Sequence, residues 1–302
     1  FIGHEIYHVP APHVEGLPKI NNIIYKTGVE ELKWIEETTS KIGEWRDTIR
    51  STYIRWAITI NGLHVAAEKY KDPKWKQNNE FYITGFRMEA GVRPTVAKLV
   101  TWDGDTAADA HLKTVNMIAS YGIIDLYSCF EEMIFDFYRT YLKDNPGNFI
   151  VGPENRDLRR LHRNKENDLE AWNKAWKERL DKWQRKKIYD GLDQVFLSYM
   201  NTAGLEKPSS YKHTTPETWA ETIKEIAILR NCLTHGEKHY PQELADISKK
   251  PHGLGFNFEA GAEINLSTKH LMSVELFADQ LLSAINLSLV EKGESEYKKY
   301  SS

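Results

Sequence analysis

The sequence predicts a mostly helical protein with one small β-hairpin insertion, and three observations support this fold class. Apolar residues recur every three or four positions over most of the 302 residues. Two short β-prone runs, 81–86 and 96–102, stand close together among glycines. Hydrophobic residues make up 41% of the chain and charged residues 27%, which is typical of a globular protein that buries a core. We therefore expect a helical bundle with an N-terminal helical extension.

The length allows two ordinary domains, and segments rich in proline and glycine suggest where they meet. Proline, glycine and histidine crowd the first 28 residues, which predicts an irregular arm, and a boundary is expected near Asp105. The expected regions are an arm at 1–28, a helical region with a small β element at 29–105, a helical domain at 106–292 and a polar tail at 293–302.

Helical spacing of apolar residues predicts one or two helices over 29–70, and further helices over 112–142, within 156–187, over 214–235 and over 268–290. The runs 81–86 and 96–102 predict one hairpin, and the runs 254–258 and 263–266 predict a second.

The helix over 214–235 has the strongest local signals. Thr214 or Thr215 provides the N-cap, Pro216 suits the first turn, and Glu217 is placed to form a capping box with Thr214. Gly236 can adopt the left-handed conformation that ends a helix. We therefore expect this helix to end near residue 235.

Arg230 interrupts the apolar face of that helix. On a wheel of 100° per residue it lies within the arc formed by Ile223, Ile226, Ala227, Leu229 and Leu233. Burying an unpaired guanidinium costs several kcal/mol, so Arg230 is expected to meet an acid, an oligomer interface or an anionic ligand. Glu132, on the 112–142 helix, is a candidate partner for Arg230 or a candidate cleft residue.

Asn231 and His235 lie four residues apart and share one flank of the helix, whereas Arg230 and His235 are about 140° apart on the wheel. The negative end of the helix dipole favours a protonated imidazole, so His235 is available for general acid–base chemistry.

With Arg230, Asn231 and His235, the chain resembles the HEPN superfamily, whose helical domains have an Arg-polar-x-x-x-His motif late in the domain. The resemblance covers roughly residues 110–292 and implies a HEPN-like helical bundle and a metal-independent endoribonuclease that works without a cofactor. It also implies a homodimer whose two motifs share one cleft, with His235 assisting attack of a ribose 2′-hydroxyl on the adjacent phosphate. Arg230 would then stabilise the phosphate, and Asn231 would orient its neighbours. Family members often act as toxins or in antiviral defence, so an antitoxin or regulatory partner is a further expectation.

A basic stretch is the second candidate RNA contact. Residues 156–187 contain 12 lysines and arginines against 6 acids, and Arg159, Arg160 and Arg163 are candidates for RNA backbone contacts. Arg156 and His162 also satisfy a loose Arg-to-His spacing, but they lie in a solvated basic segment. The helical spacing of Trp172, Trp176 and Trp183 favours core packing, with base stacking as the alternative.

The remaining composition narrows the function classes. A net charge of −3 argues against nonspecific nucleic-acid binding by the whole surface. With only two cysteines, no apparent signal peptide and no uninterrupted apolar run of membrane length, we expect a cytoplasmic protein without a membrane partner.

Two further functions compete with the ribonuclease. Residues His4 to His8 spell the His-Glu-x-x-His of zinc hydrolases, but their surroundings are irregular, and we expect no metal there or at His235 and His239. The second is a non-catalytic HEPN-fold protein that binds a nucleotide or RNA, or acts as a scaffold.

Overall fold

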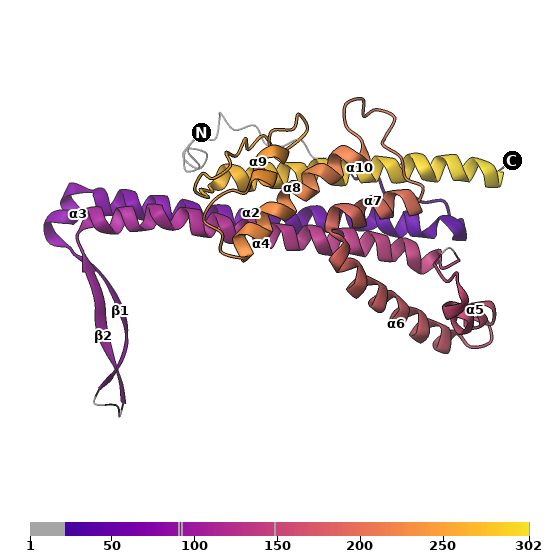
Figure 1. Ribbon diagram of the computed structural model, residues 1–302, viewed down its shortest axis with the longest axis horizontal. Coiled ribbons are helices and arrows are strands. Elements are labelled where there is room, and N and C mark those ends of the chain that lie inside the picture. The colour runs from indigo at the N-terminus through magenta and orange to yellow at the C-terminus, as the bar shows by residue number, and fades with distance from the viewer. Residues whose placement is uncertain (1–21, 90, 92, 148, 302) are drawn as a thin grey trace. The chain divides into compact units, whose positions relative to one another are not determined.

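The computed structural model describes residues 22–89, 91, 93–147 and 149–301 (Figure 1). Residues 22–28, at the end of the predicted arm, have no helix or strand. The His-Glu-x-x-His sequence at 4–8 lies outside the described residues.

In the described part of the chain, helices dominate and one antiparallel hairpin accompanies them, which confirms the prediction of a mostly helical protein with a small β-hairpin (Figure 1). The helices are α2 (Lys33–Lys71), α3 (Pro73–Asn78), α4 (Gly104–Asp144), α5 (Arg156–Arg163), α6 (Leu169–Lys187), α7 (Leu192–Thr202), α8 (Pro216–Thr234), α9 (Gln242–Ile247) and α10 (Thr268–Ser301). The 3-10 turns in the described part of the chain are η2 (Glu30–Leu32), η3 (Pro153–Asn155) and η4 (Ile188–Asp190).

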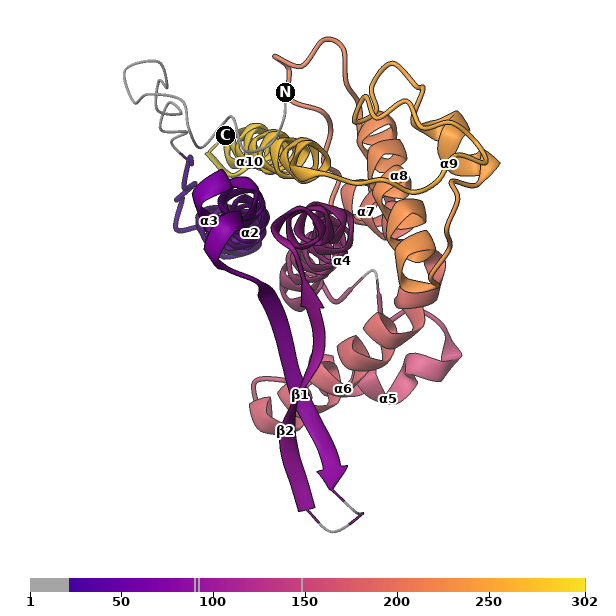
Figure 2. The ribbon, with the colours of Figure 1, turned by 90° about the vertical axis from the view of Figure 1, so that its left-hand side faces the viewer.

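The first predicted hairpin is present as β1 (Phe81–Glu89) and β2 (Arg93–Trp102), which Figure 2 shows as a two-stranded ribbon. A register irregularity lies between Ile83 and Thr84. The second predicted hairpin, over 254–266, is wrong. Gly255, Asn257 and Gly261 have positive φ, which turns the chain repeatedly, and the only ladder contact there among the described residues is a bridge from His239 to Glu263.

The chain divides into two compact units. Among the described residues, one unit contains Thr52–Gly122 and Asn265–Met272, and the other contains residues 22–51, Ile123–Ile264 and residues 273–301. The boundary expected near Asp105 falls in the first turn of α4. The second unit holds the predicted motif, and its core is rich in fully buried aromatic side chains: Phe130, Phe137, Phe196 and Tyr199.

Several helix boundaries differ from the sequence-based prediction. The 156–187 segment divides into α5 and α6, because the Asp168 carboxylate accepts a hydrogen bond from the Ala171 N–H and caps a new helix. Helices α7 and α9 were not predicted, although α7 buries Val195, Phe196 and Tyr199 at helical spacing. Helix α10 runs past Val290 through the expected polar tail.

Among the described residues, one helix, Thr268–Lys299 within α10, is long and apolar enough to cross a membrane by length and composition alone. This is weak evidence, because a core helix passes the same test. Half of its most apolar window is buried, and Asn286 exchanges two hydrogen bonds with the backbone of Ile23. We attribute the apolar character of α10 to packing within the protein.

Candidate active site

Helix α8 begins as its local sequence predicts, with one correction. Thr215 is the N-cap and Pro216 the first helical residue, as expected. The capping box joins Thr215 to Thr218, with the Thr218 hydroxyl accepting from the Thr215 N–H at 2.9 Å. The predicted box between Thr214 and Glu217 is wrong, because the cap lies one residue later and its partner moves with it.

The end of α8 is a Schellman motif. The Gly236 N–H donates to the carbonyl of Leu233 at 3.3 Å, and the Glu237 N–H donates to the carbonyl of Cys232 at 3.0 Å. Gly236 has φ +70°, which confirms the predicted left-handed stop, and His235 is the C-cap residue. The imidazole is therefore attached where the last helical carbonyls concentrate negative potential.

Arg230 is half-buried and packs on an aromatic ring. Its guanidinium carbon lies 5.0 Å from the ring centroid of Tyr127 on α4, and Nη1 donates to Asn231 Oδ1 at 3.0 Å. Its Nε has no exposed surface and no acceptor in the described part of the chain. No acid forms an ion pair with Arg230 among the described residues. The guanidinium therefore keeps most of its hydrogen-bonding capacity unused.

Tyr127 provides the platform below the guanidinium and was missed by sequence reasoning. The residue is 7% exposed, and burial, reinforced by the charge of Glu131 and opposed by Arg230, raises the pKa of its hydroxyl to about 12. The phenol is therefore neutral at physiological pH. Helical spacing from the buried Phe130 and Ile134 marks Tyr127 as a core position and could have identified it.

Glu132, the predicted partner, is exposed and forms no ion pair with Arg230 among the described residues. The acids that act electrostatically on Tyr127 are Glu131 and Asp193. A role for Glu132 at a cleft stays a prediction.

The other motif residues face solvent. Asn231 and His235 are exposed, and so is the turn through His239 that follows them. The structure therefore brings Arg230 and Asn231 into direct contact and leaves the imidazole one turn away on the open surface. The chemistry available there combines an exposed imidazole with a guanidinium that can bind an anion.

The basic stretch divides into bound and free side chains. Arg159 donates to the backbone carbonyls of Ile150 and Gly152, so it stabilises the turn before α5. Arg160 lies 3.6 Å from Asp157 in an exposed ion pair, and Arg163 is exposed. Of the three predicted RNA contacts, Arg160 and Arg163 therefore remain accessible.

The second Arg-to-His pattern ends in a packed histidine. The ring of His162 lies 4.8 Å from the ring of Trp172, and burial together with the charge of Lys165 lowers the pKa of this imidazole. Trp172, Trp176 and Trp183 are each at most 6% exposed, which confirms that they are core residues.

No group of three or more His, Cys, Asp or Glu side chains suited to a metal ion occurs among the described residues. No protein family model, curated protein or solved structure matches the chain.

Proposed function

We propose that this protein is a metal-independent endoribonuclease of the HEPN type. The proposal rests on Arg230, a half-buried guanidinium that has an aromatic platform and an amide neighbour but no acid partner among the described residues. Such a group has the charge and the free donors to bind a phosphate. The order of a long helix α4, the motif helix α8 and a final helix α10 also agrees with a HEPN-like bundle.

The proposed reaction is transfer of a phosphodiester to its own ribose. His235 takes the proton of the 2′-hydroxyl as this oxygen bonds to phosphorus, and the bond from phosphorus to the 5′-oxygen breaks. The leaving oxygen takes a proton from water, and protonated His235 then returns its proton to the solvent, which gives a cyclic phosphate and a 5′-hydroxyl end. Arg230 stabilises the charge on the phosphate oxygens, and Asn231 orients the guanidinium through the bond already present.

A homodimer completes the proposed site. The turn that bears His235 is exposed along its length, so a single chain supplies only one side of a catalytic centre. A second copy would provide the opposite wall, exclude water and bring a second motif to the RNA. We propose a cytoplasmic toxin or antiviral effector, regulated by a partner protein.

A non-catalytic HEPN-fold protein is the second candidate. The observation that favours it is the contact of Arg230 with Tyr127 and Asn231, because both contacts would equally suit an arginine that only packs. In that case the protein would bind RNA or a nucleotide, or act as a scaffold, without cleaving.

Cleavage of a fluorescent single-stranded RNA in excess EDTA tests the proposal. His235→Ala and Arg230→Met are each expected to lower the single-turnover rate by about 100-fold or more, which is typical of losing a general base or a charge-stabilising group. His162→Ala, which removes the packed histidine, is the matched control and should stay within about twofold.

The outcomes separate the candidates. Cleavage that survives both motif substitutions contradicts the ribonuclease site, and cleavage that only EDTA abolishes points to a metal enzyme. RNA binding without cleavage by the unmodified chain supports the non-catalytic function.

A further inference from the structure

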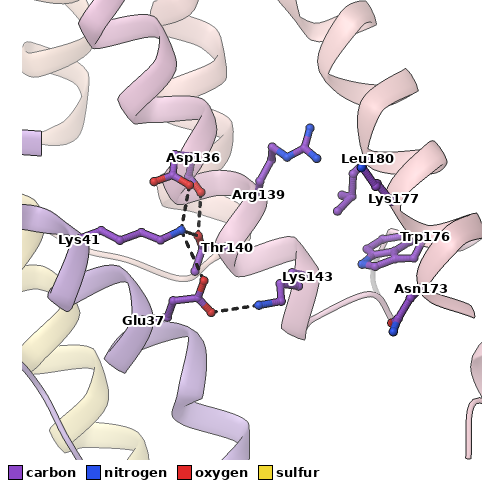
Figure 3. A pocket seen from close by; sticks show the side chains of 10 residues that line it. All are labelled: Glu37, Lys41, Asp136, Arg139, Thr140, Lys143, Asn173, Trp176, Lys177 and Leu180. Atoms are coloured by element: carbon purple, nitrogen blue, oxygen red, sulfur yellow. Dashed lines mark hydrogen bonds and ion pairs between the residues drawn. The ribbon is translucent and has the colours of Figure 1, made fainter. Parts of the chain in front are cut away.

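A second polar site lies in a groove between α2, α4 and α6. The groove has a volume of about 330 Å³ and lies wholly within the larger unit (Figure 3). None of the residues that line it belongs to the motif at the end of α8. A volume of this order matches small-molecule sites.

Positive side chains outnumber acids in this groove. Lys41 enters from α2, Arg139 and Lys143 from α4, and Lys177 from α6, whereas Glu37 and Asp136 are the only carboxylates in its wall (Figure 3). Asp181, which lies outside the lining, pairs with Arg139, so four cations face three carboxylates and one positive charge is in excess.

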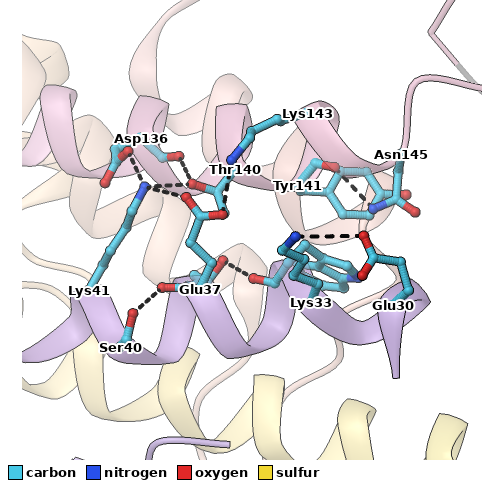
Figure 4. Close-up of polar contacts among 12 residues, drawn as sticks. Glu30, Lys33, Glu37, Ser40, Lys41, Asp136, Thr140, Tyr141, Lys143 and Asn145 are labelled. Atoms are coloured by element: carbon cyan, nitrogen blue, oxygen red, sulfur yellow. Dashed lines mark hydrogen bonds and ion pairs between the residues drawn. The ribbon is translucent and has the colours of Figure 1, made fainter. Parts of the chain in front are cut away.

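The two carboxylates are already engaged. Lys41 Nζ lies 2.9 Å from an Asp136 oxygen and 3.4 Å from a Glu37 oxygen, and Lys143 Nζ lies 3.2 Å from the other Glu37 oxygen (Figure 4). Arg139 is bound outside the groove lining by Asp181 at 2.9 Å. Trp45 Nε1 donates to the other Asp136 oxygen at 2.9 Å, so both carboxylates are satisfied within the protein and Lys177 carries the excess charge.

Two donors of α6 have no acceptor. Lys177 is exposed and forms no ion pair or hydrogen bond among the described residues. Trp176 is 4% exposed, and its indole N–H is buried without a partner in the described part of the chain. A buried N–H without an acceptor costs roughly 1–3 kcal/mol, which an incoming acceptor would recover after a small rotation of the ring.

We propose that this groove binds a terminal phosphate carried by a nucleotide or by the end of an RNA strand. A terminal phosphate has three acceptor oxygens, which match the donors of Lys143, Lys177 and Trp176, and its negative charge suits the excess cation. A carboxylate has two oxygens in one plane, so it would leave one of these donors without an acceptor. Trp176 and Leu180 supply the apolar wall beside the charged end.

Isothermal titration calorimetry on the full chain tests the proposal with three probes: inorganic phosphate, AMP and a short oligouridylate with a 5′-phosphate. The double variant Lys143→Gln and Lys177→Gln removes two groove cations that lie at the surface, so the fold should survive, as far-UV circular dichroism would verify. Its matched control is Lys174→Gln and Lys182→Gln, which removes the same charge from exposed positions of α6 that do not line the groove.

We expect at least one probe to bind, with Kd raised about tenfold or more by the groove variant, equal to about 1.4 kcal/mol, and about twofold or less by the control. Binding of AMP identifies a free nucleotide as a source, and binding of the oligouridylate alone identifies a strand. Equal weakening by both double variants at matched ionic strength would mean diffuse attraction and would overturn the site. Failure of all three probes to bind would overturn it as well. None of these readouts depends on RNA cleavage.

Discussion

Arg46 on α2 and Arg230 on α8 both interrupt the buried faces of their helices, but their guanidinium groups have different partners. Arg46 is 5% exposed, and its terminal nitrogens donate to Asp279 and Ser283 of α10. Arg230 has an aromatic ring and the amide of its own neighbour. The Nε of each lacks a partner among the described residues, so the difference lies at the terminal nitrogens.

This difference separates a structural arginine from a candidate functional one. A charge is buried for stability only when its partners compensate for lost hydration, as Asp279 does for Arg46. Arg230 has one amide acceptor and one aromatic ring in the described part of the chain, so its own chain compensates less for its lost hydration. A half-buried guanidinium that no acid of the described chain pairs is a reason to expect a ligand.

The largest expected effect is on Arg46. Replacing Arg46 with Met leaves Asp279 with Arg50, 3.0 Å away, as its remaining partner, and should lower the free energy of unfolding by about 3 kcal/mol. Urea denaturation measures this. Lys33→Met removes an exposed pair with Glu30 at 3.6 Å and should change stability by about 0.5 kcal/mol or less. A loss at Arg46 as small as that at Lys33 would remove the contrast.

A buried acid on α8 gives the next effect. Glu225 has no exposed surface, accepts the N–H of Leu254 at 3.1 Å, and has its other oxygen unpartnered among the described residues. Burial, partly offset by the Leu254 N–H, raises its pKa from 4.5 to about 7. The folded chain therefore holds this proton where the unfolded chain releases it, so the stabilising contribution of Glu225 is fully present below pH 4.5 and is lost as the pH rises through about 7.

Glu225→Gln should remove a decline of about 3 kcal/mol in the free energy of unfolding between about pH 4.5 and pH 8. Glu221, one turn earlier and paired with Lys250 at the surface, provides the control Glu221→Gln, which should keep the decline. If both variants keep it, the Glu225 carboxyl is not the group responsible, and α8 contains no buried acid that titrates near neutrality.

Sequence reasoning located the ends of α8 because the signals are local. Thr215, Pro216 and Gly236 act through their own backbone conformation or through groups within three residues, so the sequence contains the whole interaction. The Arg230 anomaly was also readable, since a helical wheel needs only the spacing of neighbours.

The failures concern partners distant in sequence. Tyr127 is 103 positions before Arg230, and only the packing of α4 beside α8 makes it the platform of the guanidinium. The 254–266 segment looks β-prone, but the Leu254 N–H donates to the Glu225 carboxylate and the Phe258 N–H donates to the Ser248 hydroxyl. These backbone groups therefore bind side chains instead of a neighbouring strand. Periodicity cannot reveal such contacts, because they depend on the completed fold.

Gly236→Ala tests the geometry that positions His235. The position has φ +70° and open space around a new methyl group, so the expected loss of about 1 kcal/mol comes from backbone strain alone. Gly62→Ala, in the middle of α2 and also with open space, should instead gain about 0.5–1 kcal/mol. Thermal unfolding of the two variants should therefore shift in opposite directions, and shifts of the same sign would contradict a strained cap at Gly236.

The smallest expected change is the one that decides the comparison. Arg230→Met removes the cation but keeps a long, polarizable side chain on the ring of Tyr127, so the free energy of unfolding should fall by about 0.5 kcal/mol, close to the value of the lost cation–π contact. A loss near that of Arg46→Met would assign Arg230 a structural role and favour the non-catalytic function. A small loss or a gain in the free energy of unfolding, together with abolished RNA cleavage, would mean that the fold does not need the charge of Arg230. The charge would then serve a ligand.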